Sequence, residues 1–325
     1  MEEKTCYYVL KVLRALYRRF FGKVPTQLTK EYNPEKASDL IYRLLAQEKP
    51  CMIARFGAIE LSTVVNYLSV RQTKHSVWRF IKDMEPQWWW DLDLISHMQS
   101  NAGFFPATID KICQFSELIL QDIKEVDVLA SWRHDEVYVK DRLEKTDMIS
   151  LPLLEPYWSQ RPWTRVLEDK HVLVVHPFAD DIVNQYNNNR DKLFRDKNVL
   201  PKFASLRVVK AVQSIGGGDN LEYKDWFEAL SWMEGQMDKE IYDIALIGCG
   251  AYGFPLAAHA KRTGHKAVHM GGALQLLFGI RGKRWDYNNS IEEFDYSTLP
   301  NEYWIRPDAS TKTTFTAKVE GGCYW

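Results

Sequence analysis

Short apolar runs that alternate with longer helical segments are the feature that most constrains the fold of this chain. Seven runs have the composition of buried strands, at residues 52–55, 126–130, 148–151, 172–175, 206–212, 244–247 and 266–270. Helical segments are predicted at 34–47, 109–123, 182–194, 226–237 and 255–263. Strands that are apolar on both sides need helices over both faces of their sheet. The sequence therefore predicts an α/β fold on a mostly parallel, doubly wound sheet.

The N-terminal segment predicts a separate amphipathic helix. Over residues 5–22, Val9 and Leu13 share one face, and Lys11 and Arg18 lie on another. Such a helix can lie in the headgroup region of an anionic membrane, or it can dock onto the protein or onto a second subunit. Periodicity alone leaves both alternatives open.

Three parts of the chain are expected. Residues 1–33 form the amphipathic helix and a linker, 34–160 form an N-terminal α/β half, and 161–325 form a C-terminal Rossmann-like half. A stretch rich in proline and tryptophan before residue 163 marks the connection between the two halves.

Composition removes several classes of function. The formal net charge of -1 offers no general attraction to DNA or RNA. Five cysteines are scattered without a Cys-x-x-Cys pair, which predicts neither a disulfide framework nor a structural zinc site. Neither a membrane span nor a signal peptide is recognisable. We expect a cytoplasmic protein whose only membrane contact is peripheral, at the inner face, through the N-terminal helix.

The clearest local motif is a glycine turn, Gly248-x-Gly250-x-x-Gly253, between a predicted strand and a predicted helix. Glycine permits a tight turn and a close approach of the backbone to a ligand, and the start of a helix offers N–H groups to a phosphate. We therefore expect Gly248, Gly250, Tyr252 and Gly253 to line a diphosphate site. The alternative is a turn whose glycines serve only the close packing of strand and helix.

A second glycine pair and a basic loop follow the last predicted strand. Gly271 and Gly272 come directly after it, and Arg281 and Lys283 belong to a run of three cations within four residues. Arginine binds phosphate through forked N–H donors, and lysine acts as a point charge. All four residues are predicted to bind the diphosphate, with a solvated basic loop as the alternative.

The first predicted strand runs directly into Arg55, Gly57 and Glu60. In open α/β sheets, ligands bind beyond the carboxyl ends of the strands. We predict that Arg55 binds phosphate beside Gly57 and that Glu60 is the general base toward an acceptor hydroxyl. A structural ion pair between Arg55 and Glu60 is the alternative.

Three further residues complete the predicted site. His176 ends one strand and Gln213 follows another, so both can reach the same edge of the sheet. Trp226 offers an aromatic ring for stacking on a base or a sugar. For each residue, the alternative is a purely structural side chain.

Two motifs give the chain a resemblance to a known family. Arg55-Phe-Gly57-x-x-Glu60, with the glycine turn far downstream, resembles the GT-D-type glycosyltransferases of bacterial polysaccharide and glycoprotein assembly. Other stretches resemble proteins of bacterial capsule and lipopolysaccharide gene clusters. They are His176-Pro-Phe178, Ala211-Val-Gln-Ser214, Tyr223-Lys-Asp-Trp-Phe227, Gly248 to Pro255, Met270 to Gly279, Gly282-Lys-Arg-Trp285 and Val319 to Trp325. Together these likenesses cover most of the chain from about residue 50 onward.

The resemblance implies a hexosyltransferase-like enzyme with a Rossmann-like core. Such an enzyme moves a sugar from a nucleoside-diphosphate sugar, with a UDP-sugar as the first expectation, to a hydroxyl of a glycan or lipid-linked acceptor in surface polysaccharide biosynthesis. The family has an Asp-x-Glu motif after the arginine, but here Ala58 stands at the aspartate position and only Glu60 matches. Hard oxygen ligands suit Mg²⁺ or Mn²⁺, so we expect either no metal or a cation that binds together with the donor.

Two other classes of function stay open. An NAD(P)-dependent oxidoreductase or epimerase of nucleotide sugars uses the same glycine turn, but the strand that ends near His269 lacks an acidic residue for the ribose. A non-catalytic binding protein of a polysaccharide assembly complex is compatible with Ala58.

Overall fold

One parallel sheet organises the computed structural model, which describes residues 2–22, 28–214, 222–286, 294–312 and 322–325. Its strands are β1 (Cys51–Ala54), β2 (Val128–Ser131), β3 (Asp147–Ser150), β4 (His171–His176), β5 (Ser205–Lys210), β6 (Ile244–Ile247) and β7 (Lys266–His269). Their order in space is β3-β2-β1-β7-β6-β4-β5, and every neighbouring pair is parallel. The predicted α/β class with a doubly wound, Rossmann-like sheet is confirmed.

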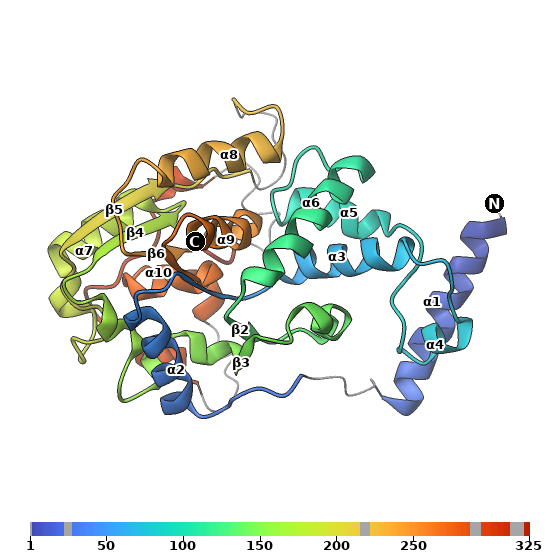
Figure 1. Ribbon diagram of the computed structural model, residues 1–325, viewed down its shortest axis with the longest axis horizontal. Helices are drawn as coiled ribbons and strands as arrows, with labels where there is room; N and C mark the ends of the chain where they lie inside the picture. Colours follow the sequence, from blue (N-terminus) through green and yellow to red (C-terminus); the bar gives the residue numbers. More distant parts are fainter. Residues whose placement is uncertain (1, 23–27, 215–221, 287–293, 313–321) are drawn as a thin grey trace.

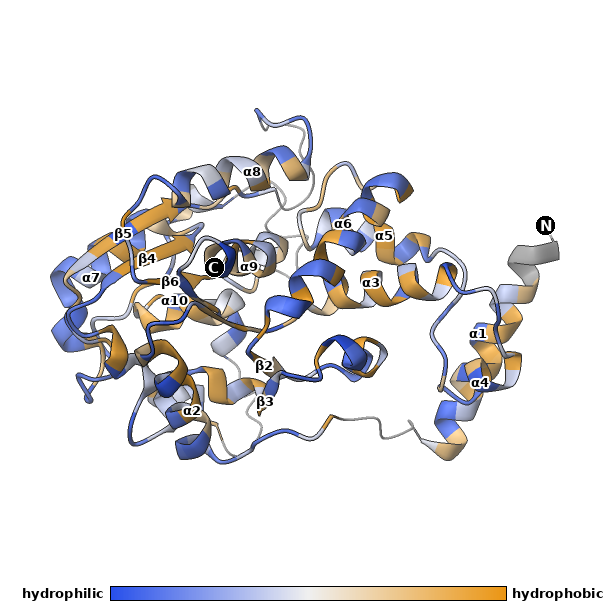
Figure 2. Ribbon diagram, viewed as in Figure 1, coloured by the Kyte–Doolittle hydropathy of each residue, from blue (hydrophilic) through white to orange (hydrophobic). Residues whose placement is uncertain are grey.

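The inner strands β1, β2, β4, β6 and β7 are buried on both faces, as their apolar runs predict, whereas the edge strands β3 and β5 are partly exposed. Successive side chains point to opposite sides, so Met52 and Ala54 of β1 lie in one core while Cys51 and Ile53 lie in the other. Figure 2 shows the middle of β4 as a hydrophobic ribbon.

Helices complete both cores (Figure 1). The first core includes residues of α3 (Ala58–Val70), α5 (Leu92–Ser100), α6 (Ile109–Asp122), α8 (Trp226–Met237) and α9 (Gly253–Arg262). The second includes residues of α2 (Pro34–Ala46), α7 (Ala179–Leu193) and α10 (Leu274–Leu277). The sheet is therefore wound on both sides.

Some helices begin with side-chain caps and others do not. The Asn33 side chain accepts from the backbone N–H of Lys36 at the start of α2, and Asp225 accepts from that of Glu228 at the start of α8. Each of these caps satisfies one of the N–H groups that a helix start leaves without a partner. By contrast, α3 and α9 have no such cap, and both begin beside the pocket described below.

Helices α1 (Glu2–Phe21) and α4 (Val77–Ile81) lie together at one end of the molecule, away from the sheet (Figure 1). The Nε atoms of Arg14 and Arg18 donate to the Asp83 carboxylate at 2.9 and 2.8 Å, and Tyr7 stacks on Trp89. The predicted amphipathic helix is present, and its basic side docks onto the protein itself. No helix in the described residues is both long and apolar enough to cross a bilayer.

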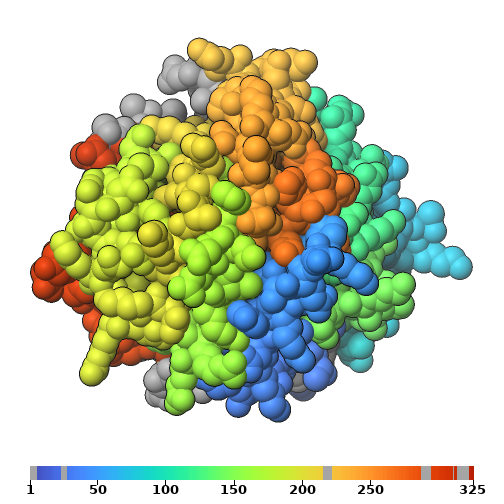
Figure 3. Space-filling view, turned by 60° about the vertical axis from the view of Figure 1, so that its left-hand side comes forward, coloured from blue at the N-terminus to red at the C-terminus, as the bar shows by residue number. Residues whose placement is uncertain are grey.

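The two predicted halves share this sheet, because β7 pairs with β1 on one side and with β6 on the other. Helix α2 also packs on residues of the second half, where Arg165 forms an ion pair with Asp39 at 2.8 Å. In the space-filling view the blue surface of α2 adjoins the green surface that precedes α7 (Figure 3). The boundary near residue 160 stays a prediction.

Candidate functional site

The main pocket lies at the carboxyl ends of the strands, where neighbouring strands lead to opposite faces. β4 continues into α7 on the second face, whereas its neighbour β6 continues into α9 on the first. Likewise β1 leads to α3 and its neighbour β7 leads to α10. Loops that diverge in this way leave a crevice, which is the usual ligand site of open α/β sheets.

Residues from six strand ends meet in this pocket. The predicted residues that line it are Arg55, Gly57, Glu60, His176, Gln213, Gly248, Gly250, Tyr252, Gly271 and Gly272. Residues that the sequence analysis did not select also line it, and they include Asn101, Trp132, Ser214, Cys249, His269, Gln275, Arg284 and Tyr324. Four predicted residues, Gly253, Arg281, Lys283 and Trp226, do not line it.

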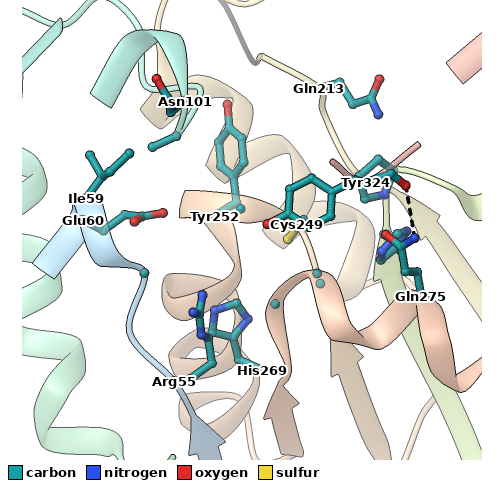
Figure 4. A pocket seen from close by; sticks show the side chains of 18 of the residues that line it. Arg55, Ile59, Glu60, Asn101, Gln213, Cys249, Tyr252, His269, Gln275 and Tyr324 are labelled. Carbon is teal, nitrogen blue, oxygen red and sulfur yellow. Dashed lines mark hydrogen bonds between the residues drawn. The ribbon is translucent and has the colours of Figure 1, made fainter. Parts of the chain in front are cut away.

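Arg55 is the principal cation of the pocket (Figure 4). Its guanidinium carbon lies 4.9 Å from the centre of the Trp132 ring, and the Trp132 indole N–H donates to the Phe56 carbonyl oxygen at 2.9 Å. Among the described residues, the guanidinium forms no hydrogen bond and no ion pair. The alternative of a structural Arg55–Glu60 ion pair is therefore not what the structure shows.

Burial lowers the pKa of Arg55, while Tyr324 and Glu60 act to raise it. Arginine nevertheless stays charged in proteins. Burying a cation that no carboxylate contacts lowers the stability of the folded protein, because the cation loses its hydration. A phosphate or carboxylate ligand offsets that loss with charge-assisted hydrogen bonds. The surroundings of Arg55 therefore fit an anionic ligand.

Three helical segments begin at the pocket without a side-chain cap. They are α3, which follows Gly57, and the short segments Gly250–Tyr252 and Gly271–Ala273. The first N–H groups of a helix have no acceptor within it, and they attract negative charge. Together with Arg55, these backbone donors make the pocket positive in character.

The three glycines of the turn have different roles. Gly250 has a φ of +58°, and the nearest atom that a Cβ there would meet is a carbonyl oxygen 3.8 Å away, so it borders the pocket. A Cβ on Gly248 would lie 2.6 Å from the Gly271 carbonyl oxygen, and one on Gly253 would lie 2.2 Å from His269 Cε1. Gly248 and Gly253 are thus required for packing, which was the alternative interpretation of the motif. Gly250 borders open space, and Gly248 also lines the pocket.

Glu60 is the third residue of α3, and its carboxylate folds back over the start of the helix. A Cβ on Gly57 would lie 2.0 Å from Glu60 Oε2. An acidic side chain at this position is stabilised by the partial positive charge at the N-terminus of the helix. Glu60 also lines the pocket, where it is the only carboxylate among the described lining residues.

The lining residues do not fit a divalent cation held by the protein alone. Mg²⁺ and Mn²⁺ prefer several oxygen ligands, and the pocket offers one carboxylate because Ala58 stands where a second would be. No group of three or more His, Cys, Asp and Glu side chains in the described chain is arranged to bind a metal ion.

Two buried histidines line the pocket in opposite tautomers. His176 Nδ1 accepts from the Phe178 N–H at 3.0 Å, so its proton is on Nε2. His269 Nδ1 donates to the Ile247 carbonyl oxygen at 3.3 Å, which leaves Nε2 as an acceptor. Burial lowers the pKa of each to about 3, and nearby Arg55 adds to the shift for His269. Neither histidine supplies positive charge at neutral pH.

Tyr252 is held in the pocket wall by a hydrogen-bonded chain. Its hydroxyl lies 2.8 Å from Ser214 Oγ, and the Ser214 hydroxyl donates to the Gly103 carbonyl oxygen at 2.5 Å. Behind it, Trp226 is fully buried and stacks on the Tyr252 ring with centroids 4.9 Å apart. The prediction that Trp226 stacks on a ligand is wrong, because that ring supports Tyr252 from the core.

The basic loop contributes a different cation from the two that were predicted. Arg281 Nε lies 2.9 Å from Asp286 Oδ1, and neither Arg281 nor Lys283 lines the pocket. Arg284 does line it, and Arg284 Nη1 donates to the Tyr324 hydroxyl at 3.0 Å. The structure does not bring Arg281 and Lys283 to the lining of the described pocket, and their binding of a phosphate stays a prediction.

Some of the unpredicted residues had a signal in the sequence and others had none. Trp132 comes two residues after a predicted strand, and Arg284 belongs to the cation run that was recognised. Tyr324 reaches the pocket only because the backbone of the segment 322–325 pairs with Lys283 and Arg284. No local pattern predicts that pairing.

Comparison of the chain with protein-family models, curated proteins and solved structures finds no match. The geometry of the pocket is therefore the support for a functional assignment. The likeness of the two motifs to GT-D-type enzymes stays a prediction.

Proposed function

We propose that the pocket binds the diphosphate of a nucleotide sugar and that the protein is a glycosyltransferase acting on a hydroxyl of a glycan or lipid-linked acceptor. The observation that carries this proposal is Arg55, a desolvated guanidinium that forms no hydrogen bond and no ion pair among the described residues and is attracted by Glu60 only over a longer distance. The uncapped helix starts around it add backbone donors suited to phosphate oxygens. A diphosphate matches this set better than a single carboxylate, because it presents several oxygens in different directions.

The reaction makes two demands that these residues meet. The bond between the anomeric carbon of the sugar and the diphosphate oxygen breaks, and the diphosphate leaves with the electron pair. Arg55 and the helix starts neutralise the charge that develops on it. The acceptor oxygen bonds to the same carbon and gives its proton to Glu60, the only carboxylate among the described lining residues.

The oxidoreductase alternative has less support. β6, α9 and β7 form the βαβ unit in which a dinucleotide would bind, but β7 ends at His269, whose ring packs against Gly253. No carboxylate at that strand end is placed to bind a ribose. A nicotinamide cofactor would lack its usual polar anchor.

A thermal-shift panel tests the proposal. Nucleoside diphosphates and nucleotide sugars should raise the unfolding temperature, because a ligand that binds only the folded state stabilises it by about 2.7 kcal/mol at a hundred times Kd. NAD and NADP should have no effect. The proposal fails if no nucleotide shifts the unfolding temperature or if only the nicotinamide cofactors do.

A second measurement separates an enzyme from a binding protein. Slow release of the nucleoside diphosphate from a donor that binds, in the absence of acceptor, supports catalysis. A donor that binds and stays intact over hours supports the non-catalytic alternative instead.

A further inference from the structure

Exposed apolar side chains are concentrated on α1 and α4. They form what we call the α1/α4 surface, made of Tyr8, Val9, Val12, Leu13, Leu16, Phe20, Phe21, Val77 and Trp78. These residues are half of the large hydrophobic side chains that are exposed in the described chain. Phe20 and Phe21 are each 74% exposed and Trp78 is 72% exposed. A patch of this kind on a water-soluble surface indicates a contact with something else.

The helix geometry shows that this surface is not the one that docks α1 onto the protein. Val9, Leu13, Leu16 and Phe20 are separated by three or four positions, so they form one stripe along the helix. The docked side is a neighbouring one, where Leu10 is buried. Arg14 and Arg18 also contact Asp83 from that side. The basic side thus faces the protein, and the apolar stripe faces outward.

Charge at this end of the molecule restricts what can cover the stripe. Residues 1–22 and 74–85 together contain eight Lys and Arg and four Asp and Glu, so this end of the molecule has a formal excess of four positive charges even with Asp83 and Glu85 counted, whereas the whole chain has a net charge of -1. Arg19, next to Phe20, is exposed and has no ion pair among the described residues. Exposed aromatic rings beside cations are typical of helices that lie in the interface of an anionic bilayer.

We infer that the α1/α4 surface binds an anionic lipid bilayer, with the apolar stripe of α1 in the headgroup region and the helix parallel to the membrane. A second copy of this chain is a poorer occupant, because a two-fold interface would bring one positive surface against another. The location of α1 and α4 at one end, away from the sheet, lets a flat membrane reach them (Figure 1). The inference does not depend on the proposed reaction in the pocket.

Vesicle binding of the full chain tests the inference. Co-sedimentation is measured with vesicles of phosphatidylcholine alone and with vesicles that also contain phosphatidylglycerol. The triple variant Leu13→Ser, Leu16→Ser, Phe20→Ser should bind the anionic vesicles at least about tenfold more weakly than the parent. The parent should bind better to the anionic vesicles than to the neutral ones, and less well at high salt.

A matched control carries the same kind of change elsewhere. Val183, Trp232 and Ile241 are also exposed apolar residues, and replacing all three with serine should leave vesicle binding unchanged. Circular dichroism and the unfolding temperature check that both triple variants fold. If the first does not fold, Phe20→Ser with Phe21→Ser at the end of α1 replaces it.

Three outcomes overturn the inference. The parent fails to bind anionic vesicles, or the α1 variant binds them as well as the parent does. The third outcome is a parent that sediments as a dimer in the ultracentrifuge, becomes monomeric in the α1 variant and binds no vesicles. That result would assign the surface to a second copy of the chain.

Discussion

Two arginine sites of this protein look similar and differ in one respect. Arg14 lies over the Phe80 ring at 4.6 Å, and Arg55 lies over the Trp132 ring at 4.9 Å. Arg14 also contacts the buried carboxylate of Asp83, as does Arg18, whereas Arg55 has no such partner among the described residues. Both arginines lie over an aromatic ring, so they differ only in whether a carboxylate contacts them. We take the contact with Asp83 as the mark of a structural ion pair and its absence at Arg55 as the mark of a ligand site.

The contact of Arg14 and Arg18 with Asp83 shows how ion pairing changes the pKa of a buried carboxylate. Burial acts to raise the pKa of Asp83, but the hydrogen bonds from Arg18 and Arg14 outweigh it, and the pKa is lowered. The carboxylate therefore stays ionised and fastens α1 to the segment that follows α4. At Arg55 no carboxylate is in direct contact among the described residues, and Glu60 acts on it only over a longer distance, which leaves room for the negative charge of a ligand. The predictions below test this contrast.

The largest effect is expected for Glu60→Gln, which retains shape but removes charge and basicity. Loss of a general base typically lowers a rate by about 10²- to 10⁴-fold. We expect transfer to fall at least about a hundredfold with little change in donor affinity, measured by steady-state kinetics and calorimetry. EDTA should have a smaller effect than the mutation, since Glu60 is the only carboxylate among the described lining residues.

Two results would contradict the role given to Glu60. One is full activity in Glu60→Gln. The other is complete inhibition by EDTA that Mn²⁺ restores, because it would require carboxylates other than the one that lines the described pocket.

Arg55→Met is expected to weaken the binding of a nucleoside diphosphate by about 10- to 100-fold, which is the range for losing one or two charge-assisted hydrogen bonds. It should not lower the unfolding free energy, because the variant removes a desolvated charge that has no described partner. Isothermal titration and urea denaturation measure the two quantities. Arg281→Met is the matched control, since Arg281 pairs with Asp286 outside the pocket, and its affinity should stay within about twofold of the parent.

Asp83→Asn should have the opposite pattern. It leaves Arg14 and Arg18 without a negative partner, and we expect a loss of about 1.5 kcal/mol, below the usual 3–5 kcal/mol because both arginines are partly solvated. Urea denaturation and amide exchange along α1 measure it. Nucleotide affinity should not change. A variant as stable as the parent, with α1 equally protected, would remove the distinction between the two arginine sites.

The smallest effect concerns the charge of the pocket histidines. The pKa of His176 is 6.5 in the unfolded chain and about 3 in the folded protein, so between these values the unfolded chain binds one more proton. The contribution of His176 to stability is complete above pH 6.5 and is lost as the pH falls toward 3. Below about pH 6, the parent should lose about 1.4 kcal/mol per pH unit more than His176→Asn. Parallel denaturation curves for both proteins from pH 6 to 5, over which the difference reaches about 1.2 kcal/mol, provide the test. Equal slopes would show that His176 is protonated in the fold.

Most of the fold could be predicted from the sequence, because buried parallel strands are local apolar runs. All seven strands were predicted to within a few residues. Helix α3 was not predicted, since it is buried on several sides and its apolar residues show little periodicity. In the Trp88–Trp90 run, Trp89 stacks on Tyr7 of α1. Contacts between distant segments of that kind leave no local pattern.

The location of the site could be predicted from the ends of the strands, but the side chains that point into it could not. Arg55, Glu60 and His176 line the pocket because the carboxyl ends of parallel strands meet at one edge. In the basic loop, which cation turns inward depends on the pairing of Lys283 and Arg284 with residues 323–325. Trp226 was misplaced because its helix presents that face to the core.

The place of β7 has a consequence for how the chain is made. Among the described residues it is the last strand to be synthesised, yet it lies between β1 and β6 and joins β3-β2-β1 to β6-β4-β5. Until residue 269 has left the ribosome, each of these three-stranded sheets exposes an unpaired inner edge. From the synthesis of β5 until β7 emerges, the nascent protein therefore carries two open edges, and a chain truncated shortly before β7 is expected to aggregate.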